Sequence, residues 1–214
     1  VETLRFADGE IGVSHDGSNL VLTGTDAITD DIKVVGAVAV TVKGVGGADT
    51  LTGGSGGDVI DGGAGADTIE GGAGADVIDG GTGADTITAG IGNHIILGDE
   101  GEVTLETDGS LIRAASTNAA VGMLDSFSLG SGTYVVIAGA GSEVITLGDG
   151  SNTVLGDAGS IQIHGDGSRT VETIDGSIGA ADTITVGSGF NIVIGGAGRD
   201  EIRVTSGDAD SRSV

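Results

Sequence analysis

The sequence contains no cysteine, no proline and no tryptophan, and aromatic residues make up only 2% of its 214 residues. Without cysteine the chain forms no disulfide bond and has no thiolate chemistry, so its stability must come from another source. Three phenylalanines and one tyrosine are too few for an ordinary globular core of this size, whereas a thin core of stacked aliphatic side chains needs none. Proline on an edge strand blocks pairing with a further strand, and this chain has no proline to do so.

Basic residues are also scarce, since 8 lysines and arginines face 32 aspartates and glutamates and give a formal net charge of −24. Such a charge disfavours nucleic acid and anionic membrane surfaces as partners and favours divalent cations. No apolar run approaches the length of about 18 residues that a membrane span requires. We therefore expect no nucleic-acid binding and no membrane insertion.

Glycine is the residue in excess, with 45 copies, yet 38% of the residues are hydrophobic and many of these are valine or isoleucine. A disordered chain usually lacks such β-branched residues. The glycines are therefore expected at particular positions, where the backbone turns through angles that are closed to residues with a Cβ atom.

A nine-residue repeat organises the chain most regularly between residues 44 and 88. Five consecutive nonamers have aspartate at the sixth position and leucine or isoleucine at the eighth. The sixth positions are Asp49, Asp58, Asp67, Asp76 and Asp85, and the eighth positions are Leu51, Ile60, Ile69, Ile78 and Ile87. Looser copies follow, in which Asp182 and Asp200 retain the aspartate and His94, Val103, Glu143, Asn152, Ile161 and Asn191 replace it.

Nine residues are too few for an α-helical repeat unit, but they suit a short strand followed by a tight turn. With the eighth side chain pointing inward, two nonamers make one turn of a flattened solenoid that has a strand on each side. The repeat therefore predicts an all-β fold: a parallel β-roll or β-solenoid with two half-coil nonapeptides per turn, interrupted by two loop insertions. Repeats two apart in sequence would stack at about 4.8 Å, the spacing between neighbouring strands.

The decay and return of the repeat predict the domain organisation. The stretch LIRAASTNAAVGML in the first insertion also has some helical character. The expected segments are an N-terminal β segment, first rungs or cap at 1–43, a regular β-roll at 44–106, to which most of the calcium sites argued below belong, an insertion at 107–137, degenerate rungs at 138–164, an insertion at 165–176 and C-terminal rungs at 177–214.

Stacking sorts the aspartates into two columns, with Asp49, Asp67 and Asp85 on one edge and Asp58 and Asp76 on the other. Carboxylates stacked in a partly desolvated turn repel one another strongly. A hard cation removes the conflict, because Ca²⁺ takes six to eight oxygen ligands at about 2.3–2.6 Å from carboxylates and carbonyls. We therefore predict that the aspartates are calcium ligands and that glycine lets the backbone wrap the ion.

The nonamer GGAGADTIE and its neighbours resemble the GGxGxDxUx repeat of RTX (repeats-in-toxin) proteins. The resemblance is close over 44–88 and looser over 89–106, 138–164 and 177–203. It implies a parallel β-roll that folds on binding Ca²⁺, secretion by a type I system and a location outside the cell, at the cell surface or in a matrix. The pieces LGDEG and LGDAG resemble segments of giant secreted RTX-like surface proteins.

The same resemblance implies a set of calcium ligands: the position-six aspartate and the carbonyls near positions two and four. Val45 departs from this pattern at the second position of the first repeat, and rungs without aspartate are expected to close by direct hydrogen bonds instead. The implied ligands are Gly47 with Asp49; Gly54, Gly56 and Asp58; Gly63, Gly65 and Asp67; Gly72, Gly74 and Asp76; Gly81, Gly83 and Asp85; Asp182; and Gly196, Gly198 and Asp200.

Position seven should face outward. It carries an aliphatic ladder of Val59, Val77 and Ile95 on one face and a threonine ladder on the other. The aliphatic ladder either lies on a solvated face, where β-branched residues are favoured, or it contacts another sheet. That second sheet would come from another copy or from the insertions folded over it.

One residue type repeated at one position is a mark of structure, whereas catalysis needs unlike groups that converge. The chain has no G-x-S-x-G elbow in a strand-to-helix setting, no phosphate-binding loop and no EF-hand loop, and we expect no enzyme activity. The predicted function is a secreted, calcium-stabilised structural module of a surface adhesin, surface layer or extracellular matrix fibre.

An uncapped end rung has unpaired N–H and C=O groups and invites head-to-tail stacking into filaments. Further copies of the chain, or adjoining repeats of a longer chain, are therefore the expected partners. Two alternatives stay open. In the first, the chain is a secretion and folding module of a larger RTX toxin, protease or lipase. In the second, it is a ligand-binding adhesin domain, and a pocket within 107–137 would favour this alternative.

Overall fold

The computed structural model describes residues 5–6, 12–16, 19–26, 28–118, 122–174, 179–205 and 212–213. All regular elements of these residues are strands, β1 to β23, which confirms the predicted all-β class. Within these residues no helix is long and apolar enough to cross a membrane. The remaining parts of the predicted segments 1–43, 107–137, 165–176 and 177–214 lie outside the described residues.

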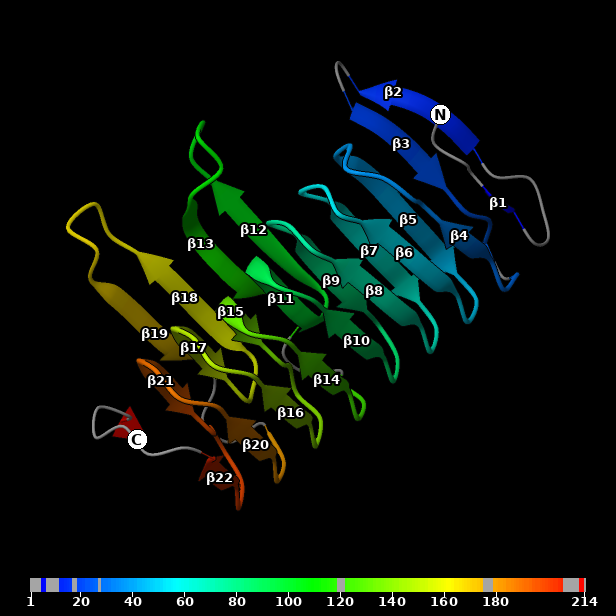
Figure 1. Ribbon diagram of the computed structural model, residues 1–214. Coiled ribbons are helices and arrows are strands. Elements are labelled where there is room, and N and C mark those ends of the chain that lie inside the picture. The colour runs from blue at the N-terminus through cyan, green and yellow to red at the C-terminus, as the bar shows by residue number, and fades with distance from the viewer. Residues whose placement is uncertain are drawn as a thin grey trace.

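Two long sheets run side by side along the whole molecule, from the N-terminal strands to the C-terminal strands (Figure 1). In order, sheet A contains β1 (Arg5–Phe6), β4 (Asp31–Lys33), β6 (Thr50–Gly54), β8 (Thr68–Gly72), β10 (Thr86–Ala89), β14 (Ser126–Leu129), β16 (Val144–Leu147), β20 (Thr183–Val186) and β22 (Glu201–Val204). Sheet B contains β2 (Gly12–Asp16), β3 (Asn19–Thr23), β5 (Val40–Gly46), β7 (Val59–Ala64), β9 (Val77–Gly81), β11 (Gly92–Asp99), β15 (Gly132–Ile137), β17 (Asn152–Leu155), β21 (Asn191–Ile194) and β23 (Arg212–Ser213).

The strand register follows the repeat. From β4 to β22 in sheet A and from β3 to β23 in sheet B, neighbouring strands are parallel. Thr50 pairs with Thr68 and Thr68 with Thr86, a shift of two nonamers at each step. Two nonamers therefore make one turn of a parallel β-roll, as predicted.

The core lies between sheets A and B and consists almost entirely of aliphatic side chains. The eighth residue of each regular repeat points into it and is at most 1% exposed. Phe127 and Tyr134 are the aromatic members of this core cluster. These eighth-position residues are Leu51, Ile60, Ile69, Ile78, Ile87 and Ile96.

The predicted loop insertions form a third, antiparallel sheet, which is a correction to the sequence-based expectation. Figure 1 shows its two hairpins projecting from the same side of the roll. Sheet C contains β12 (Gly101–Leu105), β13 (Leu111–Ser116), β18 (Gly159–Ile163) and β19 (Arg169–Thr173). The hairpins are joined because β13 pairs with β18. β13 also falls in the stretch for which some helical character was expected, and that expectation is wrong.

Two predicted boundaries change as a result. Residues 126–137, expected within an insertion, contain β14 and β15, which are full rungs of sheets A and B. β12 and β18 fall within segments predicted to be roll, yet they belong to sheet C. The nonamer pattern continued through these residues, but it did not reveal that the chain leaves the roll and returns.

Sheet C covers part of the outer face of sheet B. Leu97, Ile137 and Leu155 of sheet B form a second hydrophobic cluster with Leu111 and Ile161 of sheet C. Ile95, at the end of the aliphatic ladder, packs against this cluster, whereas Val59 is 43% exposed. The insertions therefore fold over one end of the ladder and leave the other end in solvent.

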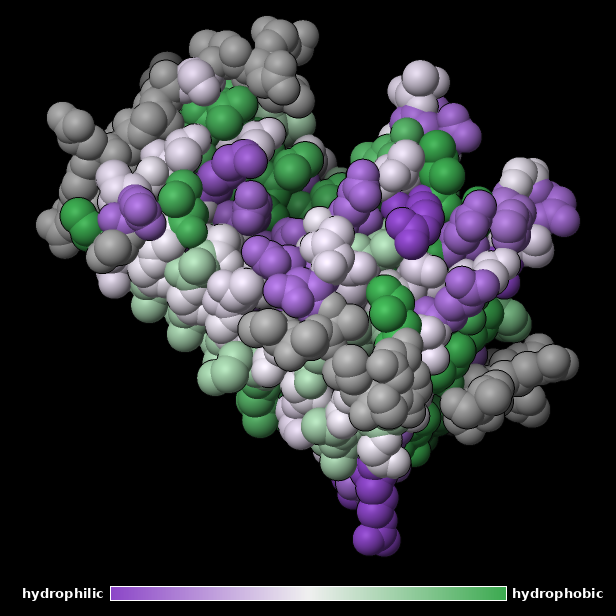
Figure 2. Space-filling model, turned by 180° about the vertical axis from the view of Figure 1, so that it is seen from behind, coloured by the Kyte–Doolittle hydropathy of each residue, from purple (hydrophilic) through white to green (hydrophobic). Residues whose placement is uncertain are grey.

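A cavity of about 400 Å³ lies where the first hairpin leaves sheet B, and Asp61, Asp79 and Glu100 are among its lining residues. Figure 2 shows hydrophilic side chains gathered in a hollow between the N-terminal end and the projecting hairpins. The Lys43 ammonium group lies 3.6 Å from the Asp61 carboxylate on the same face.

Candidate metal centre

A continuous column of acidic residues follows one edge of the roll. We call this the first edge; it consists of the turns that lead from sheet B to sheet A. All members except Asp200 are at most 1% exposed. The column contains Asp30, Asp49, Asp67, Asp85, Asp125, Glu143, Asp182 and Asp200. The predicted stacking of Asp49, Asp67 and Asp85 is confirmed, and the column extends beyond them in both directions.

One carboxylate oxygen of each aspartate accepts a hydrogen bond from the backbone of the preceding rung. The backbone N–H of Asp49 donates to Asp67 Oδ1 at 2.7 Å, and the N–H of Asp67 donates to Asp85 Oδ1 at 2.8 Å. The same bond recurs from Asp85 to Asp125 and from Asp182 to Asp200. These bonds fix the orientation of each carboxylate, so its second oxygen has a defined direction.

The second oxygen of these carboxylates has no hydrogen-bond partner among the described residues, although it is buried. This is true of Oδ2 in Asp49, Asp67, Asp85, Asp125 and Asp182, and on the opposite edge of the roll in Asp58. Asp76 Oδ2, also on the opposite edge, lies 3.1 Å from His94 Nδ1. Isolated charged oxygens are not stable in a desolvated site, because nothing replaces the water that they have lost. Their regular spacing therefore requires either protons or cations along the edge.

The free oxygen meets a backbone carbonyl at a point that only glycine leaves open. A Cβ atom on Gly62 would lie closer than 3.0 Å to both Asp67 Oδ2 and the carbonyl oxygen of Gly80. The equivalent pair converges beside Gly44 and beside Gly53. A carboxylate oxygen and a carbonyl oxygen aimed at one small space are the donor set that Ca²⁺ prefers, so the residues fit the predicted ion.

The electrostatics of the column agree with this fit. Burial, together with a smaller contribution from neighbouring carboxylates, raises the pKa of Asp67 to about 6, that of Asp85 to about 7 and that of Asp125 to about 8. Backbone hydrogen bonds oppose the shift but do not cancel it. Desolvation and like charge thus disfavour the ionised form of the column, and a bound divalent cation supplies the counter-charge that allows these carboxylates to ionise.

The glycine carbonyls predicted as ligands occupy the same turns, and several accept backbone hydrogen bonds from the next rung. The carbonyl of Gly54 accepts the N–H of Ala73 at 3.1 Å, and that of Gly63 accepts the N–H of Thr82 at 2.7 Å. Their role as calcium ligands stays a prediction. The position-one carbonyl, which the sequence reasoning missed, is the carbonyl that stands beside the free aspartate oxygen.

The opposite edge changes character along its length. We call it the second edge; its turns lead from sheet A to sheet B. Asp58 and Asp76 stack as predicted, because the N–H of Asp58 donates to Asp76 Oδ1 at 2.9 Å. Beyond Asp76 the described part of the column continues with His94, Tyr134, Asn152 and Asn191, and none of these is an aspartate.

Direct contacts close these later rungs of the second edge. The rings of His94 and Tyr134 stack with centroids 5.3 Å apart, and Asp76 N–H donates to His94 Nδ1 at 3.3 Å. Asn152 Nδ2 donates to Asn191 Oδ1 at 2.8 Å. The expected closure by hydrogen bonds is confirmed at His94, Asn152 and Asn191. Val103 and Ile161, which had been placed at the same position, lie in sheet C instead.

Glu143 does not follow that expectation. It stands in the acidic column of the first edge, and both of its carboxylate oxygens lack a hydrogen-bond partner. Asp30 and Asp125 were also missed, because extra residues precede them and break the nine-residue count. The available signal was an acid two residues before a buried apolar residue, as in Asp30 with Ile32 and Asp125 with Phe127.

The parallel roll, its aliphatic core and its buried acidic edge define a calcium-binding β-roll. The family description "RTX calcium-binding nonapeptide repeat" matches the chain in four copies, at residues 43–78, 70–105, 137–168 and 178–208. These copies cover more than half of the chain, and the protein belongs to this family. Neither a curated protein nor a solved structure matched the chain.

We expect Asp67→Asn to raise the calcium concentration at the midpoint of folding about tenfold, which corresponds to about 1.4 kcal/mol. Asparagine keeps the oxygen that accepts the N–H of Asp49 but removes the charge at Oδ2. Asp61→Asn is the matched control, because Asp61 lies on the outer face of sheet B and is 43% exposed. Calcium titration followed by circular dichroism measures both midpoints, and equal midpoints would contradict the ligand assignment.

Proposed function

We propose that this chain is a secreted, calcium-stabilised structural β-roll module of a surface adhesin, surface layer or extracellular matrix fibre. The observation that carries the proposal is the acidic column of the first edge, whose buried carboxylate oxygens are unpaired from Asp30 to Asp182. When these carboxylates are ionised, the rungs carry too much like charge to stack without cations. The presence of calcium therefore decides whether the module is ordered.

The proposed mechanism is metal-coupled folding. Calcium binds the folded roll and not the unfolded chain, so each independent site adds stability according to RT ln(1 + [L]/Kd). In the calcium-poor cytosol the chain stays open and suits type I secretion, and outside the cell it folds. Nine strands stacked in sheet A at about 4.8 Å give a stiff body roughly 40 Å long.

The proposed role is structural and not enzymatic. The buried polar residues of the first edge are alike and equally spaced, whereas a catalytic site brings together unlike groups such as a nucleophile and a base. A secretion and folding module of a larger RTX toxin, protease or lipase would use the same calcium chemistry. That alternative differs from the proposed role only in the protein domain to which the module is joined.

End-to-end assembly is the second part of the proposal. β22 is the last strand of sheet A, and among the described strands it pairs only with β20. Val204 of this strand is 44% exposed. Such an edge is a template for another strand of the same kind, either from a further copy or from adjoining repeats.

Electron microscopy of the calcium-loaded protein tests this assembly. We expect filaments whose length increases with protein concentration and which dissociate when calcium is removed. A control with Val204→Lys places a charge on the open edge and is expected to give single particles without loss of the β signal. Single particles of the unmodified chain at all concentrations would contradict end-to-end assembly.

A ligand-binding adhesin domain is the second candidate, and one feature favours it. A cavity of about 410 Å³ lies between the β12–β13 turn and the start of β11 and β15. It is lined in part by Asp108, Ser110, Leu111 and Thr133, which fall within the segment 107–137. A sugar or a protein segment held there would make the hairpins the recognition surface and the roll their support.

A further inference from the structure

Both hairpins of sheet C leave the roll through the same short sequence. Leu97–Gly98–Asp99 precedes the first hairpin and Leu155–Gly156–Asp157 the second. In each case the chain returns to the roll at an aspartate of the acidic column, Asp125 or Asp182. The exits lie on the first edge, so each hairpin base brings a carboxylate from position two of a nonamer beside the column.

The aspartate at each exit is buried and half satisfied. Asp99 is 3% exposed and Asp157 is 2% exposed. Asp99 Oδ2 accepts the backbone N–H of Ala140 at 2.7 Å, and Asp157 Oδ2 accepts that of Ala197. The other oxygen, Oδ1, has no partner in either residue among the described residues. Position two holds glycine in the regular repeats, so these carboxylates are additions to the nonapeptide pattern.

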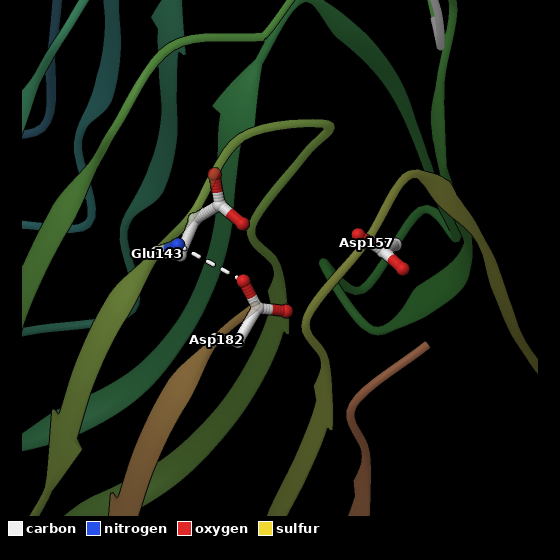
Figure 3. Close-up of side chains that lie close together, drawn as sticks. All are labelled: Glu143, Asp157 and Asp182. Carbon is white, nitrogen blue, oxygen red and sulfur yellow. Dashed lines mark hydrogen bonds between the residues drawn. The ribbon is translucent and has the colours of Figure 1, made fainter. Parts of the chain in front are cut away.

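The rung before each return aspartate supplies a third carboxylate, which is Asp85 at the first exit and the longer Glu143 at the second. Glu143 is 1% exposed, and both of its carboxylate oxygens are buried without a hydrogen-bond partner. Its own N–H donates to Asp182 Oδ1 at 2.9 Å, so the two residues occupy adjoining rungs. The Glu143 side chain is one methylene longer than that of aspartate. Figure 3 shows Glu143 beside Asp182, with Asp157 across from both.

Ligand atoms of Glu143, Asp157 and Asp182 all lie within 4.8 Å of one another. Two oxygens bound to one Ca²⁺ at about 2.3–2.6 Å can be up to about 5 Å apart, so one ion can reach all three side chains. Among the described residues no lysine or arginine forms an ion pair with any of the three. The three carboxylates are therefore close enough to share one Ca²⁺, and they have no counter-charge from a basic side chain.

We propose that Glu143, Asp157 and Asp182 bind one Ca²⁺ at the base of the second hairpin, and that this ion fastens sheet C to the roll. The site differs from the nonapeptide sites, because a position-two carboxylate and a glutamate from the neighbouring rung supply its ligands. This inference rests on the proposed function only for the identity of the ion, which is calcium in both. The first exit, with Asp85, Asp99 and Asp125 but no glutamate, is its internal comparison.

The alternative way to neutralise these side chains is a proton shared between Glu143 and Asp182. Burial, together with the neighbouring carboxylate, raises the pKa of Glu143 and favours a proton there in the absence of metal. A shared proton leaves the number of bound calcium ions unchanged when Glu143 is replaced by glutamine. A calcium site loses an ion.

The test counts calcium ions bound to the full chain by equilibrium dialysis with elemental analysis, and follows amide hydrogen exchange in β18 and β19. We expect Asp157→Asn to bind one ion fewer than the unmodified chain and to exchange at least about tenfold faster in these strands. Asparagine retains an oxygen for the N–H of Ala197. Asp99→Asn is the matched control and is expected to leave the exchange of β18 and β19 unchanged.

Glu143→Gln provides a second variant in case Asp157→Asn does not fold, because no hydrogen bond to the Glu143 carboxylate is lost. It is also expected to lose one ion. An unmodified chain that binds no calcium would overturn the proposed function itself. An unmodified chain that binds calcium, together with variants that bind the same number of ions and exchange at the same rate, would overturn this inference alone.

Discussion

Addition of EGTA to the calcium-loaded protein is expected to abolish its β-sheet circular dichroism signal. The acidic column of the first edge has unpaired buried oxygens at rung after rung. At a calcium concentration 100 times Kd, one independent site adds about 2.7 kcal/mol to folding. Several such sites together equal the total stability of about 5–15 kcal/mol that is usual for a domain, so their loss leaves an unfolded chain.

Re-addition of Ca²⁺ is expected to restore the signal, and the same concentration of Mg²⁺ to restore it poorly. Mg²⁺ requires near-octahedral geometry at about 2.0–2.1 Å and gives up its water reluctantly, whereas Ca²⁺ accepts irregular sets of oxygens. Because the rungs share a column, the calcium titration should be steep. A β-sheet signal that is indifferent to EGTA would contradict metal-coupled folding.

Substitution of Gly65 by alanine is expected to destabilise the calcium-loaded roll by about 3 kcal/mol or more. Gly65 has φ +145, and a Cβ atom there would lie closer than 3.0 Å to the carbonyl oxygen of Gly47 in the preceding rung. The carbonyl is backbone and cannot move without separating two stacked turns. The change therefore combines left-handed backbone strain with a clash inside the column.

Gly109→Ala separates these two effects. Gly109 lies in the turn between β12 and β13 with φ +86, and nothing lies within 4 Å of a Cβ atom built on it. Only the left-handed backbone strain applies at Gly109, and it costs about 1–2 kcal/mol. Unfolding by guanidinium chloride in saturating calcium measures both variants. Equal losses of stability would show that close stacking of the turns contributes nothing.

Val45 shows what the repeat pattern predicts by itself and what depends on the neighbouring rung. The sequence shows valine at a position that is glycine in the next repeats, and the structure gives it φ 83, a positive value that no other described non-glycine residue has. The register explains this, because Val45 pairs with Gly63 and must match its backbone to continue the stack. A local pattern identified the departure, but the neighbouring rung determined the conformation.

The sequence by itself determined the period, the inward eighth residue and the two edges, because one nonamer pattern is repeated without interruption from 44 to 88. Each repeat there has the same local environment, so the position of Asp67 relative to Asp49 and Asp85 follows from counting residues. The match to the RTX family rests on the same regularity.

Only the tertiary structure decided what happens after the chain leaves that frame. Asp125 enters the acidic column, Glu143 follows it one rung later, and Asp99 and Asp157 meet its side, because strands β14 and β20 return to the roll in register after hairpins of unequal length and β16 stacks on β14. The sequence distance across a hairpin does not specify this register. It is set by hydrogen bonds between parallel strands and by packing of sheet C on sheet B, which depend on residues far apart in the chain.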